Sequence, residues 1–222
     1  MLSFDEKEQE LLSKVTSLYK KTKPLILFSE EIDPNYEGNA QVWKELRDAL
    51  DHLMRVFARK FEGCSLSEED QRYIDSNLQK VIGHIYRAGC DALEGACLSL
   101  REEIKKGYEA FSLEALNAVI PSFWKNRARL HEISERIAKL RAQKDVADDE
   151  MEQIFEDFVE IVNELKEIYD QFKTRIPALY EYQEKKDHED RKIERKRWKR
   201  DLIMLLLGAA FSALLSYLIS SF

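Results

Sequence analysis

The sequence predicts an all-α fold in which a cytosolic helical bundle with long helices is followed by one C-terminal transmembrane helix. Only seven glycines and four prolines interrupt the 222 residues, and charged residues make up 35% of them. This balance is typical of long helices with solvated outer faces. Residues 147–176 repeat apolar side chains at alternating spacings of three and four, and residues 202–222 contain no Asp, Glu, Lys, Arg or His. We therefore divide the chain into a helical domain (1–176), a basic connector helix (177–201) and a transmembrane helix (202–222).

The N-terminal part of the chain predicts two helices separated by a loop. Residues 4–21 place apolar side chains on one side of a helix, and Pro24 is expected to end it. Residues 25–39 contain Pro and Gly and predict an ordered loop. A second amphipathic helix follows over residues 42–57, and Gly63 closes it.

A long third helix is expected from Ser67 toward Lys106, with Ser67 and Asp70 as an N-terminal capping pair. Three glycines inside this helix each cost about 1 kcal/mol relative to alanine, so a compensating interaction is expected. Close packing of another helix is one interpretation, and a ligand or symmetry partner approaching the glycines is the other. The residues concerned are Gly83, His84, Arg87, Gly89 and Gly95. Residues 112–120 and 122–143 predict a further helical pair.

The clearest helical pattern lies in residues 147–176. One apolar row follows a three-four spacing, and a second row lies beside it at intervals of seven: Phe155, Val162, Tyr169 and Ile176. A stripe this wide favours packing inside a helical bundle over a two-stranded coiled coil, which remains the alternative. Pro177 interrupts the pattern, and the polar run after Tyr180 predicts a solvated connector helix.

Charge is distributed unevenly along the chain. The net charge is −7, residues 188–200 carry +4 and Asp201 carries −1, so residues 1–187 carry −10. Such an acidic body argues against duplex DNA binding, which needs a broad field of Lys and Arg. The basic collar predicts a site for anionic lipid head groups or another anionic ligand. Its residues are Arg191, Lys192, Arg195, Lys196, Arg197, Trp198, Lys199 and Arg200.

The C-terminal apolar run, at about 1.5 Å per residue, covers roughly the 30 Å of a bilayer core. Basic residues directly before it predict a single-pass protein of the inner (cytoplasmic) membrane with its N-terminal domain in the cytoplasm. Small residues recur within the run at four-residue intervals: Gly208, Ser212, Ser216 and Ser220. This stripe is interpreted as a packing seam between helices, as the lining of a pore, or as part of a simple anchor.

Motifs for catalysis are missing from the sequence. It contains neither GxxxxGK[ST], GxGxxG, HExxH nor GxSxG, and its four histidines have no metal-ligand spacing. The three cysteines, Cys64, Cys90 and Cys97, make no CxxC pair and are expected to be buried and reduced. We therefore expect no enzymatic activity, no metal and no cofactor.

The basic RKIERKRWKR collar followed by GAAFSALLSYLISS resembles the small membrane effectors of bacterial anti-phage defence systems, among them the Hailong-type channel subunits. This resemblance covers the last 35 residues and rests on architecture, so it transfers no ligand-binding residue. It implies a homo-oligomer, with a tetramer as one candidate, whose helical domain gates an ion-conducting pore under control of a nucleotide or oligonucleotide. The alternative is a tail-anchored scaffold or adaptor that recruits a partner protein to the membrane.

Overall fold

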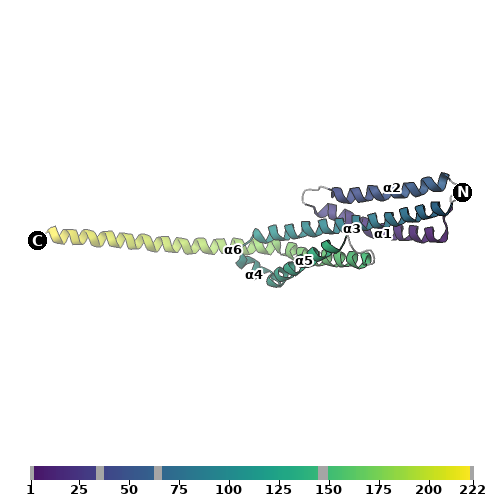
Figure 1. Cartoon of the computed structure of the whole chain (residues 1–222). Helices are drawn as coiled ribbons and strands as arrows, with labels where there is room; N and C mark the ends of the chain where they lie inside the picture. The colour runs from purple at the N-terminus through teal and green to yellow at the C-terminus, as the bar shows by residue number, and fades with distance from the viewer. Residues whose placement is uncertain (1–2, 34–37, 63–66, 145–149, 221–222) are drawn as a thin grey trace. The chain divides into compact units, whose positions relative to one another are not determined.

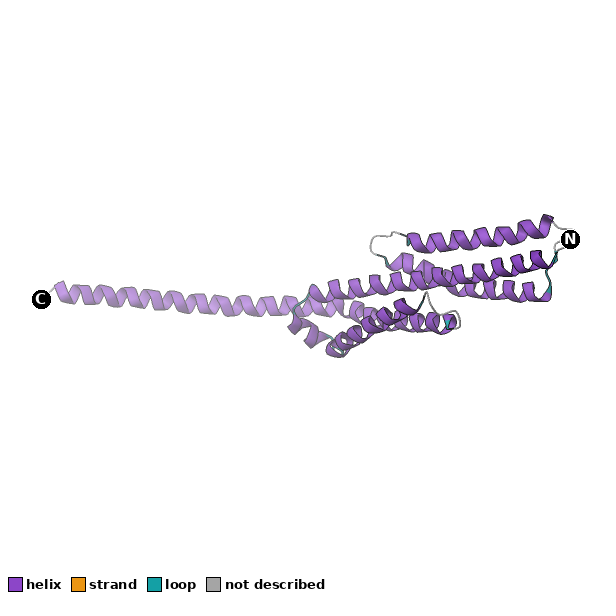
Figure 2. Cartoon of the chain, viewed as in Figure 1, coloured by secondary structure: helices purple, strands orange, loops and turns teal. Residues whose placement is uncertain are grey.

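The computed structural model describes residues 3–33, 38–62, 67–144 and 150–220. Within this part of the chain the backbone forms six α-helices and no strand (Figures 1 and 2). The all-helical prediction is confirmed. The helices are α1 (Glu6–Ile32), α2 (Ala40–Glu62), α3 (Glu68–Glu109), α4 (Leu113–Val119), α5 (Phe123–Gln143) and α6 (Met151–Ser220).

Capping residues define where the two longest helices of the N-terminal part begin. In α1, the Glu8 backbone N–H donates to Asp5 Oδ1 at 2.9 Å, and the Asp5 N–H donates to Glu8 Oε2 at 2.8 Å. In α3, Ser67 and Asp70 make the same reciprocal pair, with distances of 3.2 Å and 2.9 Å. Each box satisfies two backbone donors that a helix start leaves free. The predicted Ser67–Asp70 cap is confirmed.

Two prolines lie inside helices, where the sequence predicted interruptions. α1 continues through Pro24 to Ile32, so the predicted helix end at Pro24 is wrong, and the predicted loop over residues 25–39 is wrong for residues 25–32. Ile26 is buried, and Leu25 and Phe28 pack against the core, which offsets the roughly 3 kcal/mol cost of an internal proline. α6 likewise continues through Pro177.

The chain divides into two compact units. Unit 1 comprises residues 1–110 and 122–173, and unit 2 comprises residues 111–121 and 174–222. In unit 1, α3 packs against both α1 and α2, and its C-terminal half shares a core with α5 and α6. The predicted stripe of α6 is buried in that core: Ile154, Phe155, Phe158, Ile161, Val162, Leu165, Ile168 and Phe172. This burial supports packing within an intramolecular bundle.

Unit 2 is built from α4 and the later part of α6. The rings of Phe111 and Tyr180 meet edge to face with centroids 5.1 Å apart. Glu114 accepts a hydrogen bond from Tyr182 Oη at 3.1 Å and pairs with Lys186. These contacts hold the short helix against α6 near Tyr180, and beyond this region the α6 side chains from Glu189 to Ala209 are exposed.

The predicted transmembrane helix is corrected by the structure. No helix in the described part of the chain is long and apolar enough to cross a membrane. The side chains of Ser216 and Ser220 lie outside the described residues.

Candidate functional site

The basic collar lies on α6 within unit 2. Every residue from 191 to 200 is exposed. Arg200 is 3.4 Å from Asp201, its neighbour in sequence. Among the described residues, the basic side chains from Arg191 to Lys199 have no ion-pair or hydrogen-bond partner. Their charge is therefore available to a molecule outside the chain.

An apolar segment follows the basic collar directly. Trp198 is 66% exposed, and the six side chains from Leu202 to Leu207 are between 42% and 69% exposed. They cover all sides of the helix, because six consecutive residues pass through more than one turn. A helix that is apolar all round is normally covered. Residues 191–207 therefore combine unpaired positive charge with uncovered apolar surface.

In the described part of the chain, no other helix lies beside the small-residue stripe at Gly208 and Ser212. A Cβ added to Gly208 would meet nothing within 4 Å, and Ser212 is exposed. The described residues thus provide neither a packing partner nor a pore around this stripe.

Two of the three predicted glycines of α3, Gly89 and Gly95, lie against other helices of unit 1, whereas Gly83 has only Arg87 of α3 within 4 Å of an added Cβ. A Cβ on Gly89 would lie 2.5 Å from Phe155 Cε2 and 3.1 Å from Thr22 Oγ1. A Cβ on Gly95 would lie 3.2 Å from Ser29 Oγ. Since α1 and α6 occupy the space beside Gly89, these contacts support the close-packing interpretation of the glycines.

His84 and Arg87 point to a partner that sequence patterns did not suggest, the buried Glu45 of α2. Glu45 Oε2 lies 2.7 Å from His84 Nδ1 and 2.9 Å from Arg87 Nε. His84 Nδ1 also lies 2.9 Å from Arg87 Nη2. Burial on its own raises the Glu45 pKa, but the bonds from His84 and Arg87 outweigh it and hold the pKa below its ordinary value of 4.5. This cluster joins α2 to α3.

Two neighbouring residues extend this polar cluster. The His52 ring stacks on the His84 ring with centroids 5.2 Å apart, and His52 Nδ1 lies 2.8 Å from Asn77 Oδ1. The described residues contain no group of three His, Cys, Asp or Glu side chains that could hold a metal ion. The cluster therefore consists of an ion pair and two stacked imidazole rings that lie between α2 and α3.

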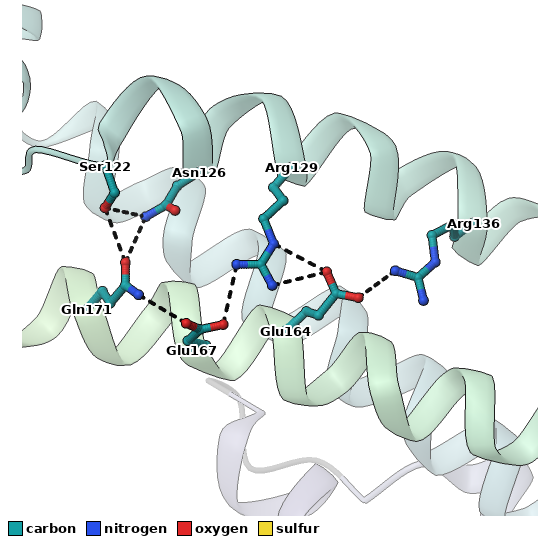
Figure 3. Close-up of polar contacts among 7 residues, drawn as sticks. All are labelled: Ser122, Asn126, Arg129, Arg136, Glu164, Glu167 and Gln171. Atoms are coloured by element: carbon teal, nitrogen blue, oxygen red, sulfur yellow. Dashed lines mark hydrogen bonds and ion pairs between the residues drawn. The ribbon is translucent and has the colours of Figure 1, made fainter.

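A second polar network joins α5 to α6 within unit 1 (Figure 3). Glu164 accepts from Arg129 Nε at 3.3 Å and from Arg136 Nη1 at 2.5 Å. About two turns further along α6, the Gln171 side-chain carbonyl accepts from Ser122 Oγ at 3.2 Å and from Asn126 Nδ2 at 3.1 Å. Figure 3 shows these side chains directed at each other across the two helices, so the network fixes how α5 lies on α6.

The cysteines of unit 1 and a groove beside α1 form no reactive site. Cys90 and Cys97 are buried, burial raises the pKa of Cys97 to about 12, and Cys64 lies outside the described residues. A groove of about 270 Å³ is lined chiefly by apolar side chains of α1, α3 and α6, with Lys21 and Glu156 paired at 3.2 Å on its rim. A high thiol pKa leaves little thiolate to act as a nucleophile.

Comparison with known proteins adds no family to this description. No protein-family model, no curated protein and no solved structure matches the chain. The functional argument therefore depends on the residues of the chain alone.

Proposed function

We propose that this protein is a non-enzymatic adaptor that binds anionic lipid head groups through residues 191–207 of α6. In this proposal unit 1 is the part that is held at the lipid surface. The observation that supports it is the run of exposed basic side chains, without partners among the described residues, that leads directly into exposed apolar residues.

The magnitude of the electrostatic attraction is sufficient for this role. Each Lys or Arg close to an anionic leaflet contributes about 1 kcal/mol, and the collar holds seven such residues. Trp198 adds an amphipathic ring of the kind that is enriched at the head-group level. The residues after it, from Leu202 onward, would contact the boundary between head groups and acyl chains.

Lipid is favoured over nucleic acid by the character of the apolar residues. Single strands are bound by basic grooves in which aromatic side chains stack on bases. Residues 191–207 contain a single aromatic residue, Trp198, followed by a block of aliphatic side chains that offers nothing for base stacking. A cationic segment followed by an aliphatic one matches a membrane surface, where anionic head groups lie beside apolar acyl chains.

Vesicle co-sedimentation of the full chain tests the proposal. We expect binding to phosphatidylcholine vesicles that contain phosphatidylglycerol, and weak binding to pure phosphatidylcholine. Replacing Lys196, Arg197, Lys199 and Arg200 by Gln removes four contributions of about 1 kcal/mol, so affinity should fall by at least ~100-fold. The control replaces four exposed lysines of unit 1 by Gln and should leave binding within about threefold of wild type: Lys20, Lys23, Lys80 and Lys139.

Two results would overturn the proposal. One is equal binding to anionic and neutral vesicles, because the collar would then contribute no attraction. The other is tight binding of a single-stranded oligonucleotide that depends on the same four residues, combined with no binding to anionic vesicles. Binding that depends on the collar should weaken as the ionic strength rises, since exposed charges are screened by salt.

A further inference from the structure

Helix α2 of unit 1 carries an apolar stripe on its exposed side. The four residues are 48% to 74% exposed and are spaced by seven, four and seven: Trp43, Leu50, Met54 and Phe61. These spacings are close to whole turns of an α-helix, so the side chains form one line about 27 Å long. The buried side of α2 is made by other residues, among them Val42, Ala49 and Val56. The stripe is therefore additional to the core of unit 1.

The order of the spacings makes the stripe self-complementary. Seven, four and seven read the same in both directions, with the centre at position 52. When a second α2 runs antiparallel across a two-fold axis at this position, Trp43 lies opposite Phe61 of the second copy, and Leu50 lies opposite Met54. Two-fold interfaces of this kind use the same patch on both copies.

Charged residues on one flank of the stripe fit the same arrangement. Lys44, Asp51, Arg55 and Glu62 are all exposed and lie on the same side of the stripe. Across the two-fold axis, this flank of one helix faces the same flank of α2 in the second copy. Lys44 then comes within two residues, about 3 Å along the helix, of Glu62 in the second copy, and Asp51 comes equally near Arg55. Opposite charges meet in both pairs, although Asp51 and Arg55 also pair within one chain at 2.7 Å. Lys44 and Glu62 are therefore the pair that is specific to the two-copy arrangement.

We propose that the exposed face of α2 is a self-association surface at which two copies of this chain pair antiparallel. The palindromic spacing and the charge pairs select a second copy, because a different protein would have no reason to require a symmetric stripe. Four apolar side chains per copy form a small interface, so we expect a dissociation constant on the order of 1–100 μM.

Sedimentation equilibrium of the full chain tests the surface. Leu50→Lys and Met54→Lys each place a charge at the centre of the stripe, and each should raise the dimer dissociation constant at least tenfold. Gln79→Lys is the matched control, since Gln79 is exposed on α3 and away from the stripe. Because all three positions are exposed in the single chain, circular dichroism should show unchanged helix content.

Charge reversal tests the antiparallel register and separates a second copy from another protein. Lys44→Glu places like charges opposite each other across the interface, as does Glu62→Lys, and each should weaken the dimer. The double variant restores opposite charges and should recover the affinity of the wild type. Recovery requires residues 44 and 62 of different copies to face each other, which a parallel pair does not provide.

Three outcomes would overturn the proposal: a monomeric wild type at ~100 μM, association that Leu50→Lys leaves unchanged, and failure of the double charge reversal to recover affinity. The proposal stands apart from lipid binding. The four-glutamine variant of the α6 collar should dimerise as wild type, and Leu50→Lys should be compared with wild type for vesicle binding in the same buffers.

Discussion

Lys60 and Lys196 carry the same charge in opposite surroundings. Lys60, in unit 1, is 6% exposed, and its Nζ lies 2.6 Å from Oε2 of the fully buried Glu8. Glu8 also accepts a hydrogen bond from Gln71 at 3.0 Å. Lys196, in unit 2, is exposed and has no partner among the described residues. A lysine in the first setting stabilises the fold, whereas a lysine in the second setting is available to a ligand.

Three further cations of unit 1 are paired as Lys60 is. In unit 1, Lys144 lies 2.7 Å from Asp91 and 3.0 Å from Glu94, and Arg129 and Arg136 share Glu164. Burial on its own lowers the Lys144 pKa, but hydrogen bonds to Asp91 and Glu94 raise it above its ordinary value. Interior cations are thus used by the fold itself. Unit 1 also has exposed lysines, such as Lys20 and Lys80. The comparison therefore teaches that the collar differs in concentrating seven exposed cations within residues 191–200.

Truncation of the buried lysine should give the largest effect on stability. Lys60→Ala leaves Glu8 buried without its cation, and breaking a buried pair from one side costs about 3–5 kcal/mol. Lys196→Ala should change the free energy of unfolding by less than about 0.5 kcal/mol, as exposed substitutions do. Urea unfolding followed by circular dichroism measures both values.

A double substitution separates lost pairing from lost packing at this site. Glu8→Gln combined with Lys60→Met removes both charges, and it should cost less than Lys60→Ala alone because no buried charge remains unpaired. If the single lysine variant were as stable as the wild type, the buried pair would contribute nothing and the contrast between the two regions would fail.

Alanine substitutions at Gly89 and Gly83 of α3 should have opposite and smaller effects on stability. Gly89→Ala brings a Cβ to 2.5 Å from Phe155, so overpacking should lower the free energy of unfolding by about 1–3 kcal/mol. At Gly83 the nearest atom is the flexible end of Arg87 at 3.4 Å, so Gly83→Ala should stabilise by up to about 1 kcal/mol. Thermal unfolding of the two variants beside wild type should shift in opposite directions. Equal shifts would mean that the glycines are not distinguished by packing.

Local signals in the sequence predicted much of this fold. The Ser67 cap and the double apolar row of residues 147–176 both depend on residues close together in sequence, and both are present. The predicted helix end at Pro24 was wrong because the effect of a proline on the backbone is local, whereas the burial of Ile26 depends on contacts with α3 that are distant in sequence.

The candidate sites were predicted to a different degree. The basic collar is contiguous in sequence, so its charge could be read directly. Glu45 is 39 residues from His84, and Glu164 is 35 residues from Arg129. Pairs at this separation have no fixed spacing to recognise. The α2 stripe was not predicted, because which apolar residues of the second helix are exposed depends on how α2 packs on α3.

Acid titration of Glu45 should give the smallest effect on stability, and it tests a single buried cluster. The Glu45 pKa is held below 4.5 in the folded chain, so the ionised carboxylate contributes stability above pH 4.5. That stability is lost as the pH falls through the lower, folded-state pKa. Glu45→Gln should therefore reduce the slope of unfolding free energy against pH on the acid side, by at most about 1.4 kcal/mol per pH unit for one proton.

Asp91 provides the internal control for that titration. Burial raises the Asp91 pKa above its ordinary value of 3.8, despite its bond to Lys144, so its contribution to stability has the opposite sign and grows as the pH falls. Glu45→Gln leaves Asp91 in place, and the difference between variant and wild type isolates Glu45. Urea unfolding at a series of pH values below 5 measures this difference. A variant whose acid slope equals that of wild type would show that His84 and Arg87 do not stabilise the charged form of Glu45, and that this cluster contributes packing alone.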